Sequence, residues 1–577
     1  MNSRRSNWVM IVLQLGLVLI VLRLFFWQVI KSDQLKAVAQ NQYNQQQQLS
    51  GQRGRIFAAD GHLLVGNLVE YRLIGQPHLF SGRPDEVVDR LTEQLGSLLA
   101  EQLPASAGGQ LSTDQAWRDR AQRELSREGA RWVPLLDGLS SADRDRLAAL
   151  NMSGITFESY SVRSYPEASM AAQVLGFLGN NDQGRPTGYF GVEGALDREL
   201  SGESQTVKRS ILNVAELVTQ SRLADQLNGR DVTLTIRRDV QRLLESKLAA
   251  GIDRYGAAAG EAIVLEPATG RILGMATLPG YHPAEYQQTD PELFGNTAVS
   301  DLYEPGSTFK VLTLAAGLDS QLLTPDTKCR RCDAPRVIDK YTIRTWNDVY
   351  HPGITMTEAL AKSDNTAMIF AVEEMGAQTF AEYLRRFRIG QEVLADIQED
   401  SDTPLPKSFG PVELATASFG QGIATTSLQM VRAFAAIANG GLMVQPKLVD
   451  SVSEYGSSRG RQTPVVELGR VISTQTADQL TAMMVNAAQY GEAQWTAADT
   501  YLVAGKTGTS QVAVEGGYDS DRTITSFIGF TPPQQPAFLL FVKLNEPQSS
   551  PWAAETAAPL WYRIADDLRL LLDAPPE

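Results

Sequence analysis

The sequence predicts a multidomain α+β protein with an N-terminal transmembrane helix. Three observations support this fold class. Residues 8–30 form one long apolar run, and residues 50–230 mix short β-like pieces with charged helical segments. A strand–helix–hairpin pattern then begins near residue 230. A length of 577 residues gives room for about three or four folding units.

The composition excludes several classes of protein. The net charge of −14 argues against a nucleic-acid partner, because such a protein needs a basic face to replace phosphate counterions. An apolar content of 43% is too low for a multi-span transporter and ample for large cores. The only cysteines are Cys329 and Cys332, so the chain is not a disulfide scaffold.

The apolar run at 8–30 is predicted to be a retained single-pass anchor. It would be roughly 34 Å long as a helix, enough to cross a hydrocarbon core of about 30 Å. A cleaved signal peptide is the alternative, since residues 37–39 read AVA, but this motif lies far beyond the uncharged core. We expect residues 1–7 to be a cytoplasmic tail and the rest of the chain to lie outside. Arg23 would snorkel or face a partner helix.

Residues 31–228 are predicted to form a stalk and an extended α+β pedestal. The polar stretch 40–48 is interpreted as a stalk or a continuation of the helix. The β-like pieces and charged helices that follow are expected at 71–74, 155–160, 85–100 and 113–128.

A further domain is predicted from 229 to 577. A strand at 231–236 precedes an amphipathic helix that ends near residue 250. Strands at 261–266 and 271–277 are joined by the turn PATG at 267–270. The Ser-, Gly- and Arg-rich segment 450–464 is expected to be a loop.

The first chemical motif is S-x-x-K, formed by Ser307 and Lys310 after a Pro-Gly break. We expect a helix to begin here, with Ser307 in its first turn and Lys310 on the same face. A serine hydroxyl is a poor nucleophile until a base removes its proton, and a partly desolvated lysine amine can do so. The positive end of the helix would stabilise the alkoxide and an oxyanion.

Two further motifs follow in order. Ser363 and Asn365 form S-x-N at the end of a helix-like stretch, 356–362, where a hydroxyl can relay a proton and an amide can bind a peptide. The third motif is KTGT at 506–509, entered from an edge-strand-like run at 500–503. Its Gly508 would leave room for a substrate backbone, while lysine and threonine suit a terminal carboxylate.

Each motif alone is more often a cap, a loop or a turn, but the ordered trio is much less common by chance. It resembles that of the penicillin-interacting serine acyltransferases. The wider chain resembles a class B penicillin-binding protein from the anchor almost to the C-terminus. The matching stretches are RGRI at 53–56, RSYP at 163–166, GYFGVE at 188–193, LEPATGRIL at 265–273 and SFGQG at 418–422.

This resemblance implies a penicillin-binding transpeptidase domain with a mixed antiparallel sheet flanked by helices, as in β-lactamases. The enzyme would be a serine-type D-Ala-D-Ala transpeptidase that cross-links peptidoglycan stem peptides and is inhibited by β-lactams. Ser307 would be acylated, Lys310 would be its base, and Ser363 would relay a proton to the leaving group. Asn365 would hold the peptide amide.

The remaining roles also follow from the resemblance. Lys506, Thr507 and Thr509 would engage the substrate carboxylate. The backbone N–H groups of Ser307 and Thr509 would form the oxyanion hole. No cofactor is expected. The partner would be a membrane glycosyltransferase, contacted through the pedestal and through Arg23.

The chain departs from the family pattern in the pedestal. Ala58 and Ala59 stand where an Asp-Arg pair is usual, and Gln173 stands where histidine is common. These changes put internal contacts of the pedestal in doubt, but not the chemistry.

Three alternative functions are disfavoured. A β-lactamase would need a glutamate base in an E-x-x-L-N-like loop, and none lies between Asn365 and Lys506. A β-lactam sensor without turnover would carry further membrane spans or a cytoplasmic domain. The formal G-x-S-x-G at 456–460 lies in a polar loop with no strand before it, so it does not predict a Ser-His-Asp hydrolase.

Cys329 and Cys332 leave alternatives open. They could form a disulfide, remain thiols, or supply half of a structural zinc site with Asp348 and His351. Thiols or a disulfide are the favoured interpretation, and some elongation-type relatives have a metal site in this region.

The resemblance also separates division-type from elongation-type enzymes. EPG before Ser307, Asn365 closing the second motif and Thr507 in the third favour the division type, which acts in septal wall synthesis. An elongation-type enzyme that maintains rod shape remains the alternative. The expected location is the bacterial inner membrane.

Overall fold

The computed structural model describes residues 3–32, 44–102, 113–210, 226–400, 402–457, 459–498, 500–514 and 517–574. The chain divides into two compact units. One comprises Met1–Gly54, Ser201–Arg230 and Glu454–Gly456, and the other comprises Arg55–Leu200, Asp231–Ser453 and Ser457–Glu577.

The smaller unit contains the N-terminal apolar helix. Helix α1 (Ser3–Phe25) continues into a π-helical turn, η1 (Phe26–Ile30). Within the described residues, the segment Trp8–Ile30 is the one helix that is long and apolar enough to cross a membrane. The predicted N-terminal apolar helix is therefore confirmed.

The polar stretch beyond this helix is partly a strand. Strand β1 (Asn44–Ser50) pairs antiparallel with β8 (Ser204–Ser210), with Asn44 opposite Ser210. The expectation of a helix continuation is therefore wrong for residues 44–48, because a partner strand from far along the chain satisfies their backbone. The AVA motif at 37–39 and residues 40–43 lie outside the described residues.

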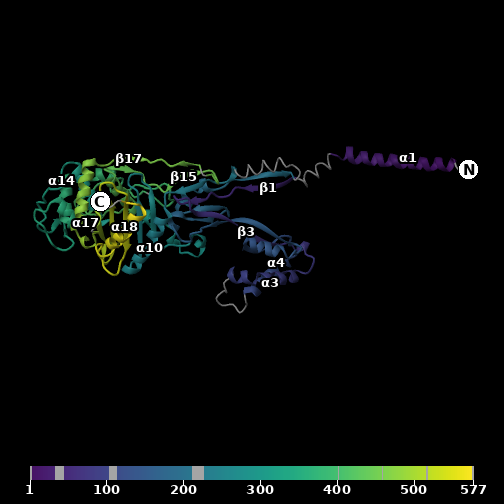
Figure 1. Ribbon diagram of the computed structural model, residues 1–577, viewed down its shortest axis with the longest axis horizontal. Coiled ribbons are helices and arrows are strands. Elements are labelled where there is room, and N and C mark those ends of the chain that lie inside the picture. Colours follow the sequence, from purple (N-terminus) through teal and green to yellow (C-terminus); the bar gives the residue numbers. More distant parts are fainter. Residues whose placement is uncertain are drawn as a thin grey trace. The chain divides into compact units, whose positions relative to one another are not determined.

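The front part of the larger unit contains the predicted pedestal elements. The long strand β3 (Leu63–Gly75) pairs antiparallel with both β4 (Val133–Leu139) and β5 (Ile155–Ser164). The predicted strands and helices are confirmed with shifted ends. The helices are α3 (Pro84–Gln102), α4 (Thr113–Leu125) and α5 (Ser141–Ala148). Figure 1 shows α3 and α4 together beside one end of β3, where Leu73, Leu91 and Trp117 share a core.

A buried ion pair joins two of the family-like stretches. The Nε atom of Arg163 lies 2.6 Å from Oε1 of Glu193, and both side chains are almost completely buried. Arg163 also donates to Asn67. The unusual residues nearby are accommodated, since Ala58 is buried and the Gln173 amide donates to the carbonyl of Pro279.

The front part of the larger unit also contains several short helices and strands. They are β2 (Ile56–Phe57), η2 (Pro77–Leu79), α6 (Ala172–Leu175), β6 (Phe177–Asn180), β7 (Pro186–Tyr189), α7 (Gly191–Ala195) and α8 (Asp197–Leu200).

A seven-stranded sheet connects this front part to the C-terminal part. Its order is β16-β15-β9-β2-β3-β4, with β5 on β3. Strand β9 (Asp231–Leu234) runs parallel to β2 on one side and antiparallel to β15 (Val449–Ser453) on the other. An ion pair of 2.6 Å between Arg55 and Asp231 lies beside the β2–β9 junction. The domain boundary at 228/229 stays a prediction.

Segment 450–464 is not simply a loop. Strand β15 is followed by β16 (Gly460–Gln462), which pairs with it as an antiparallel hairpin. The composition suggested a loop because Ser and Gly are abundant, but the exposed edge of β15 offers backbone partners to these residues.

A five-stranded antiparallel sheet forms the centre of the C-terminal part. Its order is β11-β10-β20-β19-β18. The strands are β10 (Ala259–Leu265), β11 (Ile272–Leu278), β18 (Ala504–Val514), β19 (Gly517–Thr531) and β20 (Phe538–Asn545). The hairpin predicted around PATG is confirmed as β10–β11. The strand predicted at 500–503 is wrong, because β18 begins at Ala504 and contains the third motif itself.

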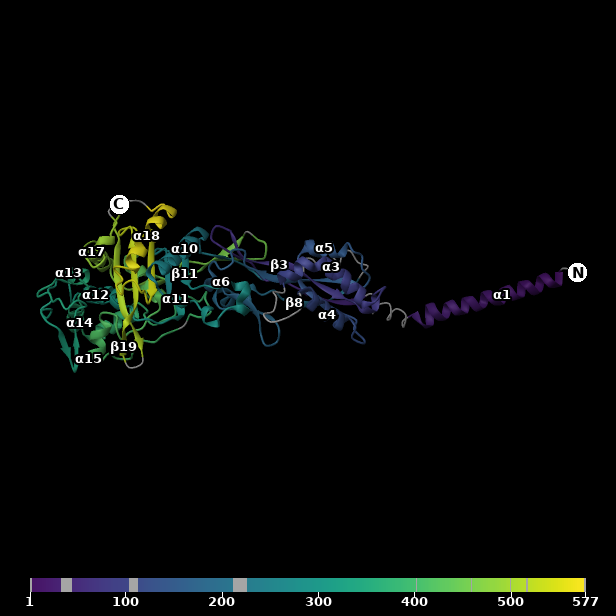
Figure 2. The same ribbon diagram turned by 90° about the horizontal axis from the view of Figure 1, so that it is seen from below.

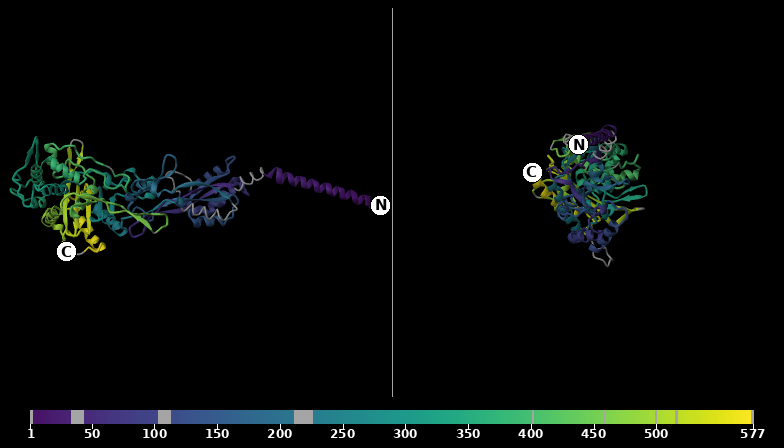
Figure 3. Two further views of the ribbon diagram at one scale, coloured as in Figure 1. Left: turned by 90° about the horizontal axis from the view of Figure 1, so that it is seen from above. Right: turned by 90° about the vertical axis from the view of Figure 1, so that its right-hand side faces the viewer.

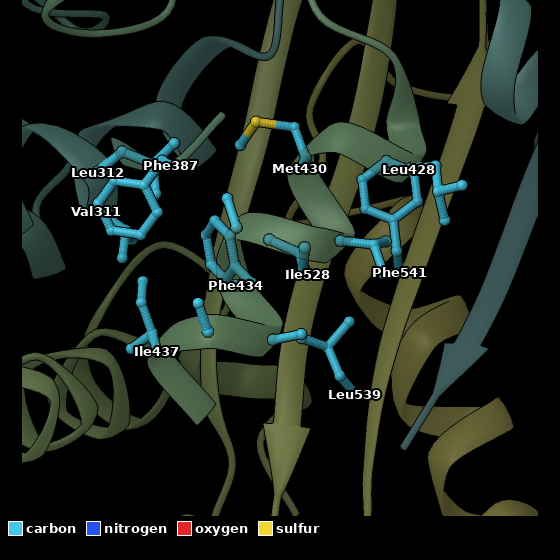
Figure 4. Packing of buried hydrophobic residues seen from close by; sticks show 14 of the residues in the cluster. Val311, Leu312, Phe387, Leu428, Met430, Phe434, Ile437, Ile528, Leu539 and Phe541 are labelled. Carbon is cyan, nitrogen blue, oxygen red and sulfur yellow. The ribbon is translucent and has the colours of Figure 1, made fainter. Parts of the chain in front are cut away.

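Helices cover both faces of this sheet. Helices α10 (Arg238–Tyr255) and α18 (Ala557–Leu571) pack on one face, where Trp561 and Phe527 are buried; Figures 2 and 3 show α18, the yellow C-terminal helix, beside the strands. The other face carries α16 (Ser427–Ala438), backed by α12 (Lys310–Asp319). Figure 4 shows Phe434 of α16 between Val311 of α12 and Ile528 of β19.

The remaining elements surround these layers. They are η3 (Pro283–Gln288), η4 (Pro291–Leu293), α11 (Thr297–Ser300), η5 (Gly306–Phe309), β12 (Arg336–Ile338), β13 (Tyr341–Ile343), α13 (Met356–Ala361), α14 (Asn365–Arg386), α15 (Pro411–Ala417), β14 (Leu442–Val444), β17 (Glu467–Arg470), α17 (Thr474–Tyr490) and η6 (Gln494–Thr496). The predicted α+β architecture is thus confirmed.

Candidate active site

One pocket collects residues from all three motifs. Its volume is about 340 Å³. Ser307 of the first motif, Asn365 of the second and Thr509 of the third line it. The other lining residues are Gly306, Trp346, Phe419, Gln421, Glu492, Ser510, Gln511, Thr523, Pro551 and Trp552. The motifs that are far apart in the sequence therefore meet at one cavity.

Ser307 lies on a short 3₁₀ turn, η5, which leads directly into α12. The prediction that Ser307 lies in the first turn of the α-helix is off by one turn. Gly306 has a φ of 54°, and a Cβ atom on it would lie 2.6 Å from the carbonyl oxygen of Thr509. Glycine is therefore required here, because the nucleophile turn packs against β18 in a left-handed conformation.

Lys310 is completely buried below this turn. Its ammonium donates to the Ser363 carbonyl oxygen at 2.5 Å, to Ser363 Oγ at 3.1 Å and to Asn365 Oδ1 at 2.8 Å. No hydrogen bond is formed between the described side chains of Ser307 and Lys310. Burial, and secondarily the positive charge of Lys506, lower the pKa of Lys310 to about 7. The amine can therefore act as a base near neutral pH.

The second motif lies in the bend between α13 and α14. Ser363 has a φ of 54°, and the next residue, Asp364, caps α14 by accepting from the Ala367 N–H. This bend directs both the Ser363 hydroxyl and the Asn365 amide oxygen toward Lys310. The Asn365 amide nitrogen donates to the carbonyl of Arg344.

The third motif lies on β18, at the edge of the five-stranded sheet. Lys506 is buried and donates to Thr507 Oγ1 at 2.9 Å. A Cβ atom on Gly508 would lie 2.5 Å from Ser526 Oγ and 2.8 Å from Thr308 Cγ2. The protein itself fills this space, so Gly508 allows η5 to approach β18, and the expected room for a substrate backbone is not what this glycine supplies.

Sequence reasoning missed several residues of this pocket, and three of them have contacts that shape the site. Glu492 follows α17 and accepts a hydrogen bond of 2.8 Å from Thr507. Trp346 and Trp552 line the cavity with ring centroids 5.2 Å apart. None of the three belongs to a short motif, so only the three-dimensional arrangement identifies them.

The four residues considered for zinc do not form a common site. Cys329 and Cys332 are joined by a disulfide. Asp348 pairs with Arg344, whose hydrogen bond lowers the pKa of that carboxyl group, and His351 Nδ1 lies 3.5 Å from Asp364. Within the described ranges, no three His, Cys, Asp or Glu side chains are grouped as metal ligands. The absence of a cofactor stays a prediction.

The G-x-S-x-G match at 456–460 lies between β15 and β16. A nucleophile elbow requires a turn from a strand into a helix, and here the chain turns from strand to strand. Its central residue, Ser458, lies outside the described residues. The local fold thus gives no support for a hydrolase of that type.

Comparison with known protein families gives two matches. Residues 260–566, more than half of the chain, match the penicillin binding protein transpeptidase domain. Residues 48–234 match the penicillin-binding protein dimerisation domain.

Curated relatives cover most of the chain. Stage V sporulation protein D of Bacillus subtilis is 31% identical over 74% of this chain and 67% of its own length. The probable peptidoglycan D,D-transpeptidase PenA of Neisseria gonorrhoeae is 24% identical over 95% of this chain and 89% of its own length.

A solved structure shows the same fold. Penicillin binding protein 2X from Streptococcus thermophilus superposes with a TM-score of 0.75 at 21% identity, covering 92% of this chain and 81% of that protein. Together, the two domain matches in their order along the chain and the relatives that span both domains establish the family. The chain belongs to the class B penicillin-binding proteins and is a peptidoglycan D,D-transpeptidase of the serine acyltransferase type.

Proposed function

We propose that this enzyme cross-links peptidoglycan stem peptides ending in D-Ala-D-Ala through an acyl-enzyme on Ser307. The observation that carries the proposal is the buried Lys310, which contacts both polar groups of the second motif beneath a pocket lined by Ser307. A lysine with a pKa of about 7 is partly neutral at physiological pH and is suited to accept the serine proton.

Acylation would proceed by attack of Ser307 Oγ on the carbonyl carbon of the penultimate D-Ala, while Lys310 accepts the hydroxyl proton. The tetrahedral oxyanion would be held by the backbone N–H groups of Ser307 and Thr509. The close packing of Gly306 against the Thr509 carbonyl supports this assignment, because it brings the two backbone segments together at the pocket.

The leaving group and the acceptor would use the same proton path. Ser363 Oγ accepts from Lys310, so it can pass the proton to the departing D-alanine amine as the peptide bond breaks. A neighbouring strand's amine then attacks the ester, loses a proton along the same path, and frees Ser307. Asn365 would hold the peptide amide, and the third motif would bind the terminal carboxylate.

The proposal also covers the location of the enzyme and its partner in the membrane. A single span at Trp8–Ile30 supports attachment to the bacterial inner membrane, with the catalytic part outside the cytoplasm. A separate membrane glycosyltransferase would supply the glycan strands. Arg23, a charge within the apolar span and exposed on α1, is the candidate contact with that partner.

A role in septal wall synthesis is the favoured one. It is supported by the EPG sequence before Ser307, by Asn365 at the end of the second motif and by Thr507 in the third. Elongation-type relatives more often have PPG, Asp and Ser at these places.

The acyl-enzyme is tested on the full-length protein in detergent with a labelled penicillin. Mass spectrometry is expected to find one adduct on Ser307 in the wild-type chain and in Ser458→Ala, and none in Ser307→Ala. An adduct that persists in Ser307→Ala would refute the nucleophile. Acylation by penicillin without cross-linking of stem peptides would indicate a sensor instead.

The pH dependence of acylation tests the base. Lys310 works as a neutral amine, so the acylation rate should rise with pH through a midpoint of about 7 and then level off. The acylation rate of Lys310→Arg should be at least about 100-fold lower than that of the wild type, because a guanidinium stays charged and cannot accept the serine proton. Stopped-flow fluorescence with a labelled penicillin measures both, and a midpoint near the ordinary lysine pKa would contradict the assignment.

The role of Arg23 is tested by co-purification with the membrane polymerase from the host. Arg23→Leu should reduce the recovered partner, because the span loses the only charge that could pair within the bilayer. Arg4→Leu, outside the apolar span, is the matched control. Equal recovery with both variants would remove Arg23 from the interface.

Depletion of the protein in its host tests the septal role. Filaments with unfinished septa are expected, since septal cross-linking would stop while lateral growth continues. Rounded cells that still divide would instead assign the enzyme to elongation. Microscopy with a fluorescent wall label distinguishes the two outcomes.

A further inference from the structure

The side-chain carboxylate of Glu492 lies beside the third motif, where the terminal carboxylate of the substrate peptide is expected to bind. Glu492 lies between α17 and η6, and about a quarter of its side chain is exposed to the pocket. Its Oε2 atom accepts a hydrogen bond of 2.8 Å from Thr507 Oγ1 and lies 3.9 Å from the Lys506 ammonium. The third motif is therefore already in contact with an internal anion.

This contact uses the only proton of the Thr507 hydroxyl. The same oxygen accepts a hydrogen bond of 2.9 Å from Lys506, so Lys506, Thr507 and Glu492 form a chain. A hydroxyl has one donor, and this donor points to Glu492. Thr507 consequently has no proton to offer to a substrate carboxylate while the chain is intact.

Thr509 is arranged differently. Its Oγ1 atom accepts from the Ala553 N–H at 3.1 Å, which leaves its own hydroxyl proton free to donate. Thr509 and Glu492 both line the pocket, whereas Lys506 and Thr507, among the described residues, lie behind its surface and are buried. The two threonines of the motif thus differ in both access and available protons.

We propose that Glu492 is a positioning residue that occupies the hydroxyl proton of Thr507, so that Thr509 rather than Thr507 donates a hydrogen bond to the substrate carboxylate, and that its negative charge partly offsets the positive charges of Lys310 and Lys506. This inference rests on the proposed function, since it assigns different roles to Thr507 and Thr509 in the acylation reaction.

The charge balance has a direct consequence for Lys310. The charged groups that act on this amine are Lys506 of β18, Glu492 after α17 and Asp364 before α14. Lys506 disfavours the ammonium, while the two carboxylates favour it. Removal of the Glu492 charge therefore lowers the pH at which Lys310 becomes a base.

The test uses acylation of the full-length protein by a fluorescent penicillin, whose carboxylate represents that of the substrate. Glu492→Gln removes the charge but keeps an oxygen that can accept from Thr507. Its midpoint of acylation against pH should shift downward by roughly half a unit. Glu467→Gln, an exposed change of the same type on β17, should leave the midpoint unchanged.

The two threonines give an independent readout. Thr509→Val should reduce the acylation rate at least about tenfold, since a hydrogen bond to a charged group is lost. Thr507→Val should reduce the rate several-fold less than Thr509→Val does, because the Thr507 hydroxyl proton is donated to Glu492. Circular dichroism melting curves verify that the variants are folded.

Two results would overturn the inference. One is an equal loss in Thr507→Val and Thr509→Val, and the other is a midpoint in Glu492→Gln that coincides with that of the wild type. A wild-type chain that is not acylated, or is acylated at another serine, would instead refute the proposed function and this inference with it.

Discussion

The active site depends on a single constraint, the burial of the Lys310 amine. A cation removed from water is costly unless it is hydrogen-bonded or loses its proton. Lys310 meets both conditions. Three oxygens from the second motif accept hydrogen bonds from the amine, and burial lowers its pKa so that it loses its proton more easily. The position of Ser363 and Asn365 follows from the same constraint, since these two residues supply all the hydrogen-bond acceptors of the amine among the described residues.

The hydrophobic core explains why Lys310 is held in this position. Residues of α12 after Lys310, such as Val311 and Leu312, are completely buried between α16 and the neighbouring helices (Figure 4). A helix fixed on all sides cannot turn to expose its first residue. The nucleophile turn η5 then has little freedom, because Gly306 and Gly508 allow it to pack directly against β18.

Local patterns in the sequence were sufficient for much of the fold and for the members of the site. The apolar run, the strand–helix–hairpin after residue 230 and the three motifs all have short-range signatures. The remaining features depend on distant partners. Strand β1 exists because β8 pairs with it, β16 because β15 has a free edge, and Glu492 is part of the site because α17 ends beside β18. The spacing of residues in the sequence does not show which distant segments pair or pack together. The role predicted for Gly508 is wrong for the same reason, because the atoms that fill the space beside it belong to Ser526 and Thr308.

The parallel pairing of β2 with β9 has a consequence for how this chain can be divided. Strand β9 lies in the middle of a sheet, with Ile56 opposite Val232 on one side and β15 on the other. A fragment that starts just before β9 would lose β2 and expose a row of unpaired backbone N–H and C=O groups. Such an edge is a template for association with other chains. A soluble catalytic fragment would therefore have to include the RGRI segment, even though residues 57–230 separate it from β9 in the sequence.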